Sequence, residues 1–174
     1  MITDTIWVVD TSVVLRAMLG DSASARAWLD HHLAIGETIV GCRMLDLEVR
    51  RTIIRMEVRG VLTPGQVDPD AYLGRFAIGA QVDTLVDEAA RLRYMLRASD
   101  ALHVAFALSL GVEGTTIVTH DEEMATACAA LGFDVIDPVG DEQARLLANG
   151  RSEVTRPSDV SGADASTFQP RPGC

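Results

Sequence analysis

The chain has 174 residues, of which 48% are hydrophobic and 23% charged, as in an ordinary globular protein with one core. Its net charge of -10 argues against broad, salt-driven binding to phosphate backbones, although metal ions held in an acidic site would offset part of that charge. Three cysteines lack the spacing of a zinc site or disulfide framework, and no segment is apolar for long enough to span a bilayer, so we expect a cytoplasmic protein without a membrane anchor.

Short β-branched runs alternate with longer segments of helical period along most of the chain. This alternation predicts an α/β fold in which helices cover a parallel sheet. The predicted strands are Ile6–Val9, Glu37–Val40, Gln81–Leu85, Thr115–Thr119 and Asp134–Ile136. The predicted helices are Ser12–Leu19, Ser22–Ala34, Arg43–Arg59, Pro64–Phe76, Val86–Leu96, Ser99–Leu110 and Glu122–Leu131. Ser22 and Ser99 are candidate N-caps.

Asp10 and Asp121 each lie between a predicted strand and a predicted helix. An aspartate at such a boundary is often a helix cap with no further role. The carboxyl ends of strands in an open parallel sheet are also where ligand crevices form, so two strands can bring these acids to one divalent cation. The pattern leaves both interpretations open.

Glu48 and Asp100 lie inside predicted helices that are largely apolar around them. An unpaired buried carboxylate is costly, and a neighbouring arginine such as Arg97 could pair with Asp100. Four carboxylates that converge without a cation would repel one another, whereas Mg²⁺ and Mn²⁺ prefer such hard oxygen ligands. The joint pattern indicates a metal-dependent hydrolase.

Four segments, in this order, carry a resemblance to a known family: Val9–Val13, Leu47–Arg50, Ser99–Ala105 and Thr119–Asp121. Together they resemble the PIN-domain ribonucleases, and especially the VapC toxins of type II toxin-antitoxin pairs. The likeness runs from about Ile6 to Pro138. The resemblance implies a three-layer α/β/α sandwich with a central parallel sheet of about five strands. It divides the chain into a PIN domain (1–138), a short C-terminal helix (139–148) and a tail (149–174) whose composition predicts disorder.

The resemblance also implies a function for the acidic residues. Asp10, Glu48, Asp100 and Asp121 match the family's catalytic acids, which bind one or two Mg²⁺ or Mn²⁺ ions. Thr11 and Ser12 match its hydroxyl beside the first acid, and Thr119 adds a hydroxyl near Asp121, so we expect these three to contact substrate. The implied activity is hydrolysis of RNA by an activated water. The implied partners are RNA, a cognate antitoxin protein and a second copy of the chain.

Several other residues have a simpler structural interpretation. Five arginines in the predicted helix Arg43–Arg59 are candidates for binding RNA phosphates, but ion pairs on a solvated helix face explain them more simply. His103 is expected to be a core histidine, and His120, beside Asp121, is a candidate substrate contact.

Two alternative functions remain open at this stage. One is a non-catalytic PIN module that only binds RNA or a protein partner. The other is a magnesium-dependent phosphatase of the haloacid dehalogenase type, which also begins with an aspartate after its first strand. That family needs a second aspartate two residues later, where this chain has Ser12.

Overall fold

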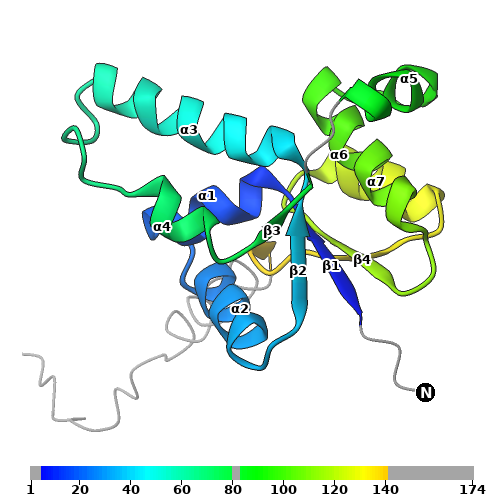
Figure 1. Ribbon diagram of the computed structural model, residues 1–174, viewed down its shortest axis with the longest axis horizontal. Coiled ribbons are helices and arrows are strands. Elements are labelled where there is room, and N and C mark those ends of the chain that lie inside the picture. The colour runs from blue at the N-terminus through cyan, green and yellow to red at the C-terminus, as the bar shows by residue number, and fades with distance from the viewer. Residues whose placement is uncertain (1–4, 80–82, 141–174) are drawn as a thin grey trace, which may run out of the picture.

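The computed structural model describes residues 5–79 and 83–140, and a five-stranded sheet lies at its centre (Figure 1). The strand order is β3-β2-β1-β4-β5, and each neighbouring pair is parallel. The strands are β1 (Ile6–Val9), β2 (Thr38–Gly41), β3 (Ala77–Ile78), β4 (Thr115–Val118) and β5 (Asp134–Ile136). The predicted α/β fold with about five parallel strands is confirmed.

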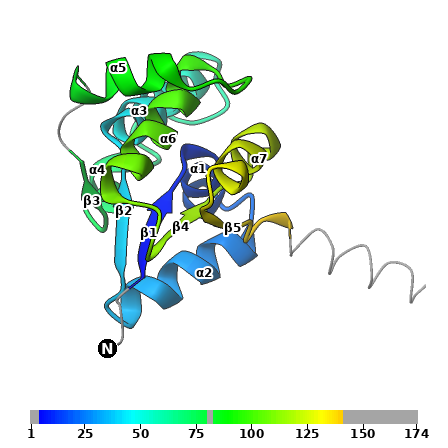
Figure 2. The same cartoon turned by 90° about the vertical axis from the view of Figure 1, so that its right-hand side faces the viewer.

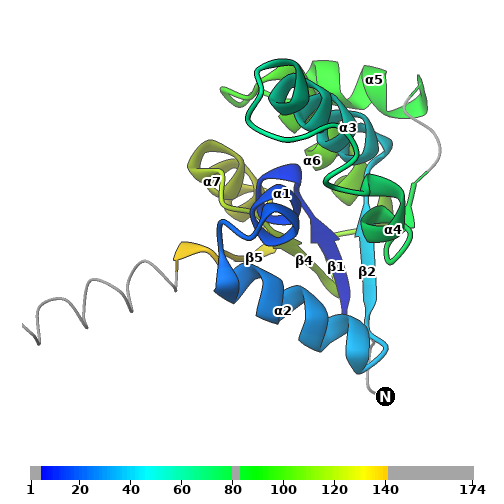
Figure 3. The same ribbon diagram turned by 90° about the vertical axis from the view of Figure 1, so that its left-hand side faces the viewer.

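Helices cover both faces of this sheet. They are α1 (Thr11–Leu19), α2 (Ala23–Ala34), α3 (Arg43–Val58), α4 (Pro69–Leu73), α5 (Asp83–Arg91), α6 (Ala98–Leu110) and α7 (Glu122–Ala130). Figures 2 and 3 show α2 at the end of the sheet where β1 begins, and α3 and α5 at the other end. Within the described ranges, no helix has both the length and the apolar character needed to cross a membrane.

The side chains of β1 alternate between two hydrophobic cores, because successive strand residues point to opposite faces. Val9 packs in the core formed with α1, α2 and α3, to which Leu29 and Leu45 also belong. Val8 packs in the core formed with α6 and α7, together with Val104 and Met124. Burial on both faces explains why β1 and β4 are continuous apolar or β-branched runs.

One predicted strand is wrong. The third strand is Ala77–Ile78, whereas the region predicted as Gln81–Leu85 enters α5 at Asp83. Leu85, Ala89 and Leu92 all pack in the core beneath α6, and their spacing is that of one helical face. The short alternation before Leu85 was therefore a weaker signal than the helical period that follows it.

Several predicted helix boundaries also differ from the structure. Helix Pro64–Phe76 contracts to α4, whose N-cap is Asp68, and helix Val86–Leu96 ends at Arg91. Ser22 is confirmed as an N-cap because its Oγ accepts a hydrogen bond from the Ala25 amide. Ser99 is not a cap, since α6 begins at Ala98. The tail 149–174 and nearly all of the predicted helix 139–148 lie outside the described residues.

An aromatic cluster joins the start of β1 to α2. The rings of Trp7 and Trp28 meet edge to face with centroids 5.3 Å apart, and His32 packs against both. Glu37 accepts a hydrogen bond from Trp7 Nε1 at 2.8 Å and also pairs with His32 Nδ1. The hydrogen bond with His32 is the main reason that the pKa of Glu37 lies below its ordinary value.

We expect Leu45→Ala to lower the free energy of unfolding by about 3 kcal/mol, because Leu45 is fully buried and its loss leaves a cavity under α3. Leu47→Ala is the matched control on the same helix, since Leu47 is 50% exposed, and its effect should stay within about 0.5 kcal/mol. Urea unfolding followed by circular dichroism measures both. Equal losses in the two variants would contradict the placement of α3.

Glu37→Gln should destabilise the protein in a pH-dependent way. Because the pKa of folded Glu37 lies below its ordinary value of 4.5, its interactions stabilise the fold above that pH and are lost as the pH falls below it. The difference in unfolding free energy between wild type and variant should therefore shrink in acid. Denaturant unfolding followed by the fluorescence of Trp7 and Trp28, the chain's two tryptophans, measures this difference. A difference that grows in acid would refute the assignment.

Candidate active site

The four predicted acids reach one edge of the sheet from different elements. Asp10 follows β1, and its amide donates to the carbonyl oxygen of Val118 at the end of the neighbouring β4. Asp121 follows β4 after a short turn. Glu48 lies on α3, which starts after β2, and Asp100 lies in the first turn of α6. The connection after β1 leads to β2, whereas the connection after β4 leads to β5 on the other side of the sheet. These diverging connections open a crevice at the carboxyl ends of β1 and β4.

A cavity of about 440 Å³ occupies this crevice, and all four acids line it. Of the three residues predicted to contact substrate, Thr11 and Ser12 line this cavity with the acids, whereas Thr119 does not. Three basic side chains complete its polar wall: Arg51, Arg55 and Arg97. The structure therefore brings the four acids together, and it shows which of the arginines named from the sequence lie beside them.

Asp10 is the most firmly held of the acids. The residue is 5% exposed, and its Oδ2 accepts hydrogen bonds from the Ser12 amide at 3.2 Å, Ser12 Oγ at 2.6 Å and Thr119 Oγ1 at 3.1 Å. The bond to the Ser12 amide makes Asp10 the N-cap of α1, so the capping interpretation is correct for its local role. All three bonds fall on one oxygen, and Oδ1 lies 3.9 Å from His103 Nε2.

Glu48 is held by a hydroxyl and by a buried imidazole. Its Oε2 accepts from Thr11 Oγ1 at 2.6 Å and lies 3.2 Å from His103 Nε2. Burial by itself raises the pKa of Glu48, but the hydrogen bonds of His103 and Thr11 outweigh it and bring the pKa to about 2. His103 is fully buried, as expected of a core residue, yet its Nε2 faces the acids. Burial lowers the pKa of His103, and the hydrogen bond to Glu48 and the charge of Asp10 outweigh this and raise it.

Arg97 forms an ion pair with each of the remaining two acids. Its Nε lies 3.1 Å from Asp100 Oδ2, and its Nη2 lies 2.9 Å from Asp121 Oδ2. Burial raises the pKa of Asp100, Arg97 opposes this rise, and the charge of Asp121 adds to it. Asp121 also caps α7 by accepting from the Met124 amide at 2.8 Å. The guanidinium group thus places one positive charge between two carboxylates.

Thr119 and His120 do not reach the cavity. Thr119 is fully buried, donates to Asp10, and accepts from the Asp121 amide at 3.0 Å, so it links two of the acids from behind. His120 donates its amide to Ser12 Oγ at 3.1 Å, and its ring lies 3.0 Å from Asp137 Oδ2. Their positions fit the support of the acids better than contact with a substrate.

The acids line one cavity, but their carboxylates are hydrogen-bonded or ion-paired to other side chains of the chain. Among the residues that the structure describes, no three Asp, Glu, His or Cys side chains are gathered closely enough to hold a metal ion. Thr11 and His103 hold Glu48, while Arg97 holds Asp100 and Asp121. Arg97 therefore occupies the place between Asp100 and Asp121 where a cation could otherwise lie.

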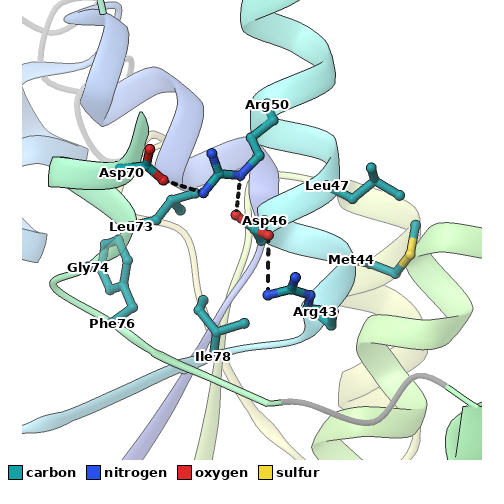
Figure 4. A pocket seen from close by; sticks show the side chains of 10 residues that line it. All are labelled: Arg43, Met44, Asp46, Leu47, Arg50, Asp70, Leu73, Gly74, Phe76 and Ile78. Atoms are coloured by element: carbon teal, nitrogen blue, oxygen red, sulfur yellow. Dashed lines mark hydrogen bonds and ion pairs between the residues drawn. The ribbon is translucent and has the colours of Figure 1, made fainter. Parts of the chain in front are cut away.

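A larger cavity, of about 810 Å³, lies on another side of α3 and contains none of the four acids (Figure 4). Arg50 lies between Asp46 and Asp70 along its wall, with nitrogen–oxygen distances of 2.6 and 2.5 Å. Arg43 also pairs with Asp46, at 3.4 Å. The charged side chains that line this larger cavity are paired with one another, so the cavity does not present an unpaired charge to a ligand.

Comparisons with known proteins agree with this architecture. The PIN domain family model matches residues 7–130. Ribonuclease VapC47 of Mycobacterium tuberculosis (strain CDC 1551 / Oshkosh) is 26% identical over 136 residues, which cover 74% of this chain and 94% of the relative.

Two crystal structures share the fold at low sequence identity. VapBC2 from Rickettsia felis, solved bound to a DNA fragment from their promoter, contains a chain that is 15% identical, with a TM-score of 0.57 and coverage of 76% of this chain and 98% of that one. PAE2754 from Pyrobaculum aerophilum is 19% identical, with a TM-score of 0.58 and coverage of 83% and 97%.

Proposed function

The chain belongs to the PIN-domain family, and from this premise we propose that it is a metal-dependent endoribonuclease that acts as the toxin of a toxin-antitoxin pair. The observation that carries the proposal is the cavity lined by Asp10, Glu48, Asp100 and Asp121. The similarity to a VapC ribonuclease over most of both chains supports RNA as the substrate. A non-catalytic binding module would have no use for four carboxylates in one cavity.

The donor chemistry of the cavity fits Mg²⁺ or Mn²⁺, as one ion or two. All four acids offer carboxylate oxygens, which these ions prefer, and the guanidinium of Arg97 already fills the place of a cation between Asp100 and Asp121. When bound, such an ion would polarise a phosphodiester and make a water more acidic.

The residues around the acids prepare them for this task. Ser12 and Thr119 fix Asp10 through Oδ2, and Thr11 with His103 fixes Glu48, so both carboxylates are held in place before a ligand arrives. The side chain of Arg97 is 74% exposed, and its ion pairs within the described residues are those with Asp100 and Asp121. If a cation took its place between these two aspartates, the guanidinium of Arg97 would be free to bind a phosphate oxygen of the substrate.

The partners follow from the same proposal. A structural neighbour is a VapBC complex, which supports a cognate antitoxin protein as the inhibitor of this chain. We propose RNA as substrate, the cytoplasm as the compartment and a homodimer as the assembly. An antitoxin segment that carries a positive charge would compete with the cation for the same four acids.

Asp10→Asn and Asp100→Asn should each reduce Mg²⁺-dependent RNA cleavage by at least about 100-fold, because even partners of metal ligands commonly contribute 10- to 100-fold. Asp87→Asn, on the exposed face of α5 and outside the cavity, is the matched control and should cleave at the wild-type rate. Cleavage is measured on purified protein with a fluorescence-quenched RNA, and circular dichroism checks the fold. Full activity in a folded Asp10→Asn variant would sink the catalytic assignment and leave a binding module as the better account.

Arg97→Gln should tighten the binding of Mn²⁺ several-fold, because the ion no longer has to displace two ion pairs, and exposed ion pairs are individually weak. Arg93→Gln removes the same charge from an exposed position on the same loop, outside the cavity, and should bind Mn²⁺ as the wild type does. Titration calorimetry of the metal alone measures this without any cleavage. Weaker Mn²⁺ binding in Arg97→Gln would show that Arg97 supports the ion and does not compete with it.

A further inference from the structure

Four of the five arginines in and beside α3 line one of the two cavities, and they form two pairs. Arg43 and Arg50 line the larger cavity, where Asp46 and Asp70 neutralise them (Figure 4). Arg51 and Arg55 line the acidic cavity instead, and both are exposed. Neither has an acidic partner within 4.0 Å in residues 5–79 and 83–140, although the chain carries a net charge of -10. Both guanidinium groups thus keep a positive charge that no ion pair within these residues neutralises, which is what an anionic ligand needs.

Arg51 and Arg55 continue the face of α3 that begins at Glu48. The positions 48, 51, 52 and 55 have the spacing of neighbours on one side of a helix. At a rise of about 1.5 Å per residue, Arg51 and Arg55 begin roughly 4.5 and 10.5 Å along the axis from Glu48. An extended polyanion that starts at the acids and runs along α3 would meet the two arginines in turn.

A hydrogen bond orients the second of these arginines. Arg55 Nη2 donates to Thr52 Oγ1 at 2.9 Å, one turn earlier in α3 and so nearer to Glu48. Thr52 also lines the acidic cavity. Its hydroxyl therefore turns the guanidinium of Arg55 back toward the site where the phosphodiester would be cleaved.

We propose that Arg51 and Arg55 bind two backbone phosphates of the RNA next to the scissile one, and that Thr52 positions Arg55 for this contact. The assignment rests on the proposed function and names the part of the site that holds the substrate strand. A planar guanidinium fork matches the oxygens of a phosphate, and such charge-assisted bonds are strong. The two arginines would also offset the repulsion between RNA and this protein, whose net charge is negative.

RNA explains these contacts better than an acidic protein segment does. Both arginines share one cavity with the acids that we propose to act on the phosphodiester, so a bound substrate strand must pass them. Phosphates repeat at every nucleotide, and the two arginines lie about one helical turn apart on the same face of α3.

The test compares two double variants that each remove two positive charges from the α3 region. Arg51→Gln/Arg55→Gln removes the unpaired arginines of the acidic cavity. Arg43→Gln/Arg59→Gln is the matched control, because Arg43 is paired with Asp46 and Arg59, at the end of α3, lies outside that cavity. Both are made in an Asp10→Asn background so that the RNA stays intact. Fluorescence anisotropy with a labelled single-stranded RNA of random sequence, over a range of salt concentrations, gives the affinity.

Loss of two phosphate contacts should lower the slope of log affinity against log salt by about 1.4 and weaken binding roughly 20-fold at about 0.1 M salt. The control double variant should bind within about twofold of the parent. Thr52→Val should weaken binding several-fold, and it should add nothing once Arg55→Gln is present, because both changes act through the same guanidinium.

Three results would overturn the proposal. Equal losses in the two double variants would mean that diffuse charge, and not these two side chains, attracts the RNA. Unchanged RNA affinity in Arg51→Gln/Arg55→Gln would show that the two arginines do not bind RNA, and would leave the proposed cleavage intact. If this variant also lost binding to a polyglutamate peptide, the arginines would be assigned to a protein partner. Failure of the parent to bind RNA at all would remove the proposed function together with this inference.

Discussion

The constraint that governs this structure is the gathering of four carboxylates at one edge of a parallel sheet, where their charges must be offset. The protein offsets the charges of the four acids in three different ways. Asp10 takes three hydrogen bonds on one oxygen, and Glu48 takes one from Thr11 and faces His103. Asp100 and Asp121 share the guanidinium of Arg97. The contacts of Asp10 and Glu48 are buried or half-buried, whereas the side chain of Arg97 is 74% exposed.

The strand order explains why the acids lie close together. Because β1 is flanked by β2 and β4, the segments that leave these three strands start side by side, and they carry Asp10, Glu48 and Asp121. The two cores above and below β1 hold α3 and α6 against the sheet, so Glu48 and Asp100 project from packed helices. Rigid elements thus supply the acids, which favours a preformed site over one that a ligand must assemble.

Local patterns in the sequence were enough to predict the sheet, most helices and the acids, because strand–acid–helix junctions and apolar periodicity are encoded within a few residues. The contacts that distinguish the site are not local. Thr11 and Glu48 are 37 residues apart, Asp10 and Thr119 are 109 apart, and His103 looked like a core residue because its neighbours are apolar. The arginines of α3 were indistinguishable in sequence, since only the fold shows which of them Asp70 can reach. The predicted strand Gln81–Leu85 is wrong because five residues are too few to outweigh the helical period that continues from Leu85 through Ala89 to Leu92.

In the proposed function, a divalent cation takes the place of Arg97 among the carboxylates, and the arginines of the cavity bind RNA. The most direct test is a crystal structure of the protein soaked in Mn²⁺, with the ion located by its anomalous scattering. The account predicts a Mn²⁺ peak inside the cavity, with Asp10 among its ligands and Arg97 withdrawn from Asp100 and Asp121. A peak elsewhere, with Arg97 still bridging the two aspartates, would contradict it.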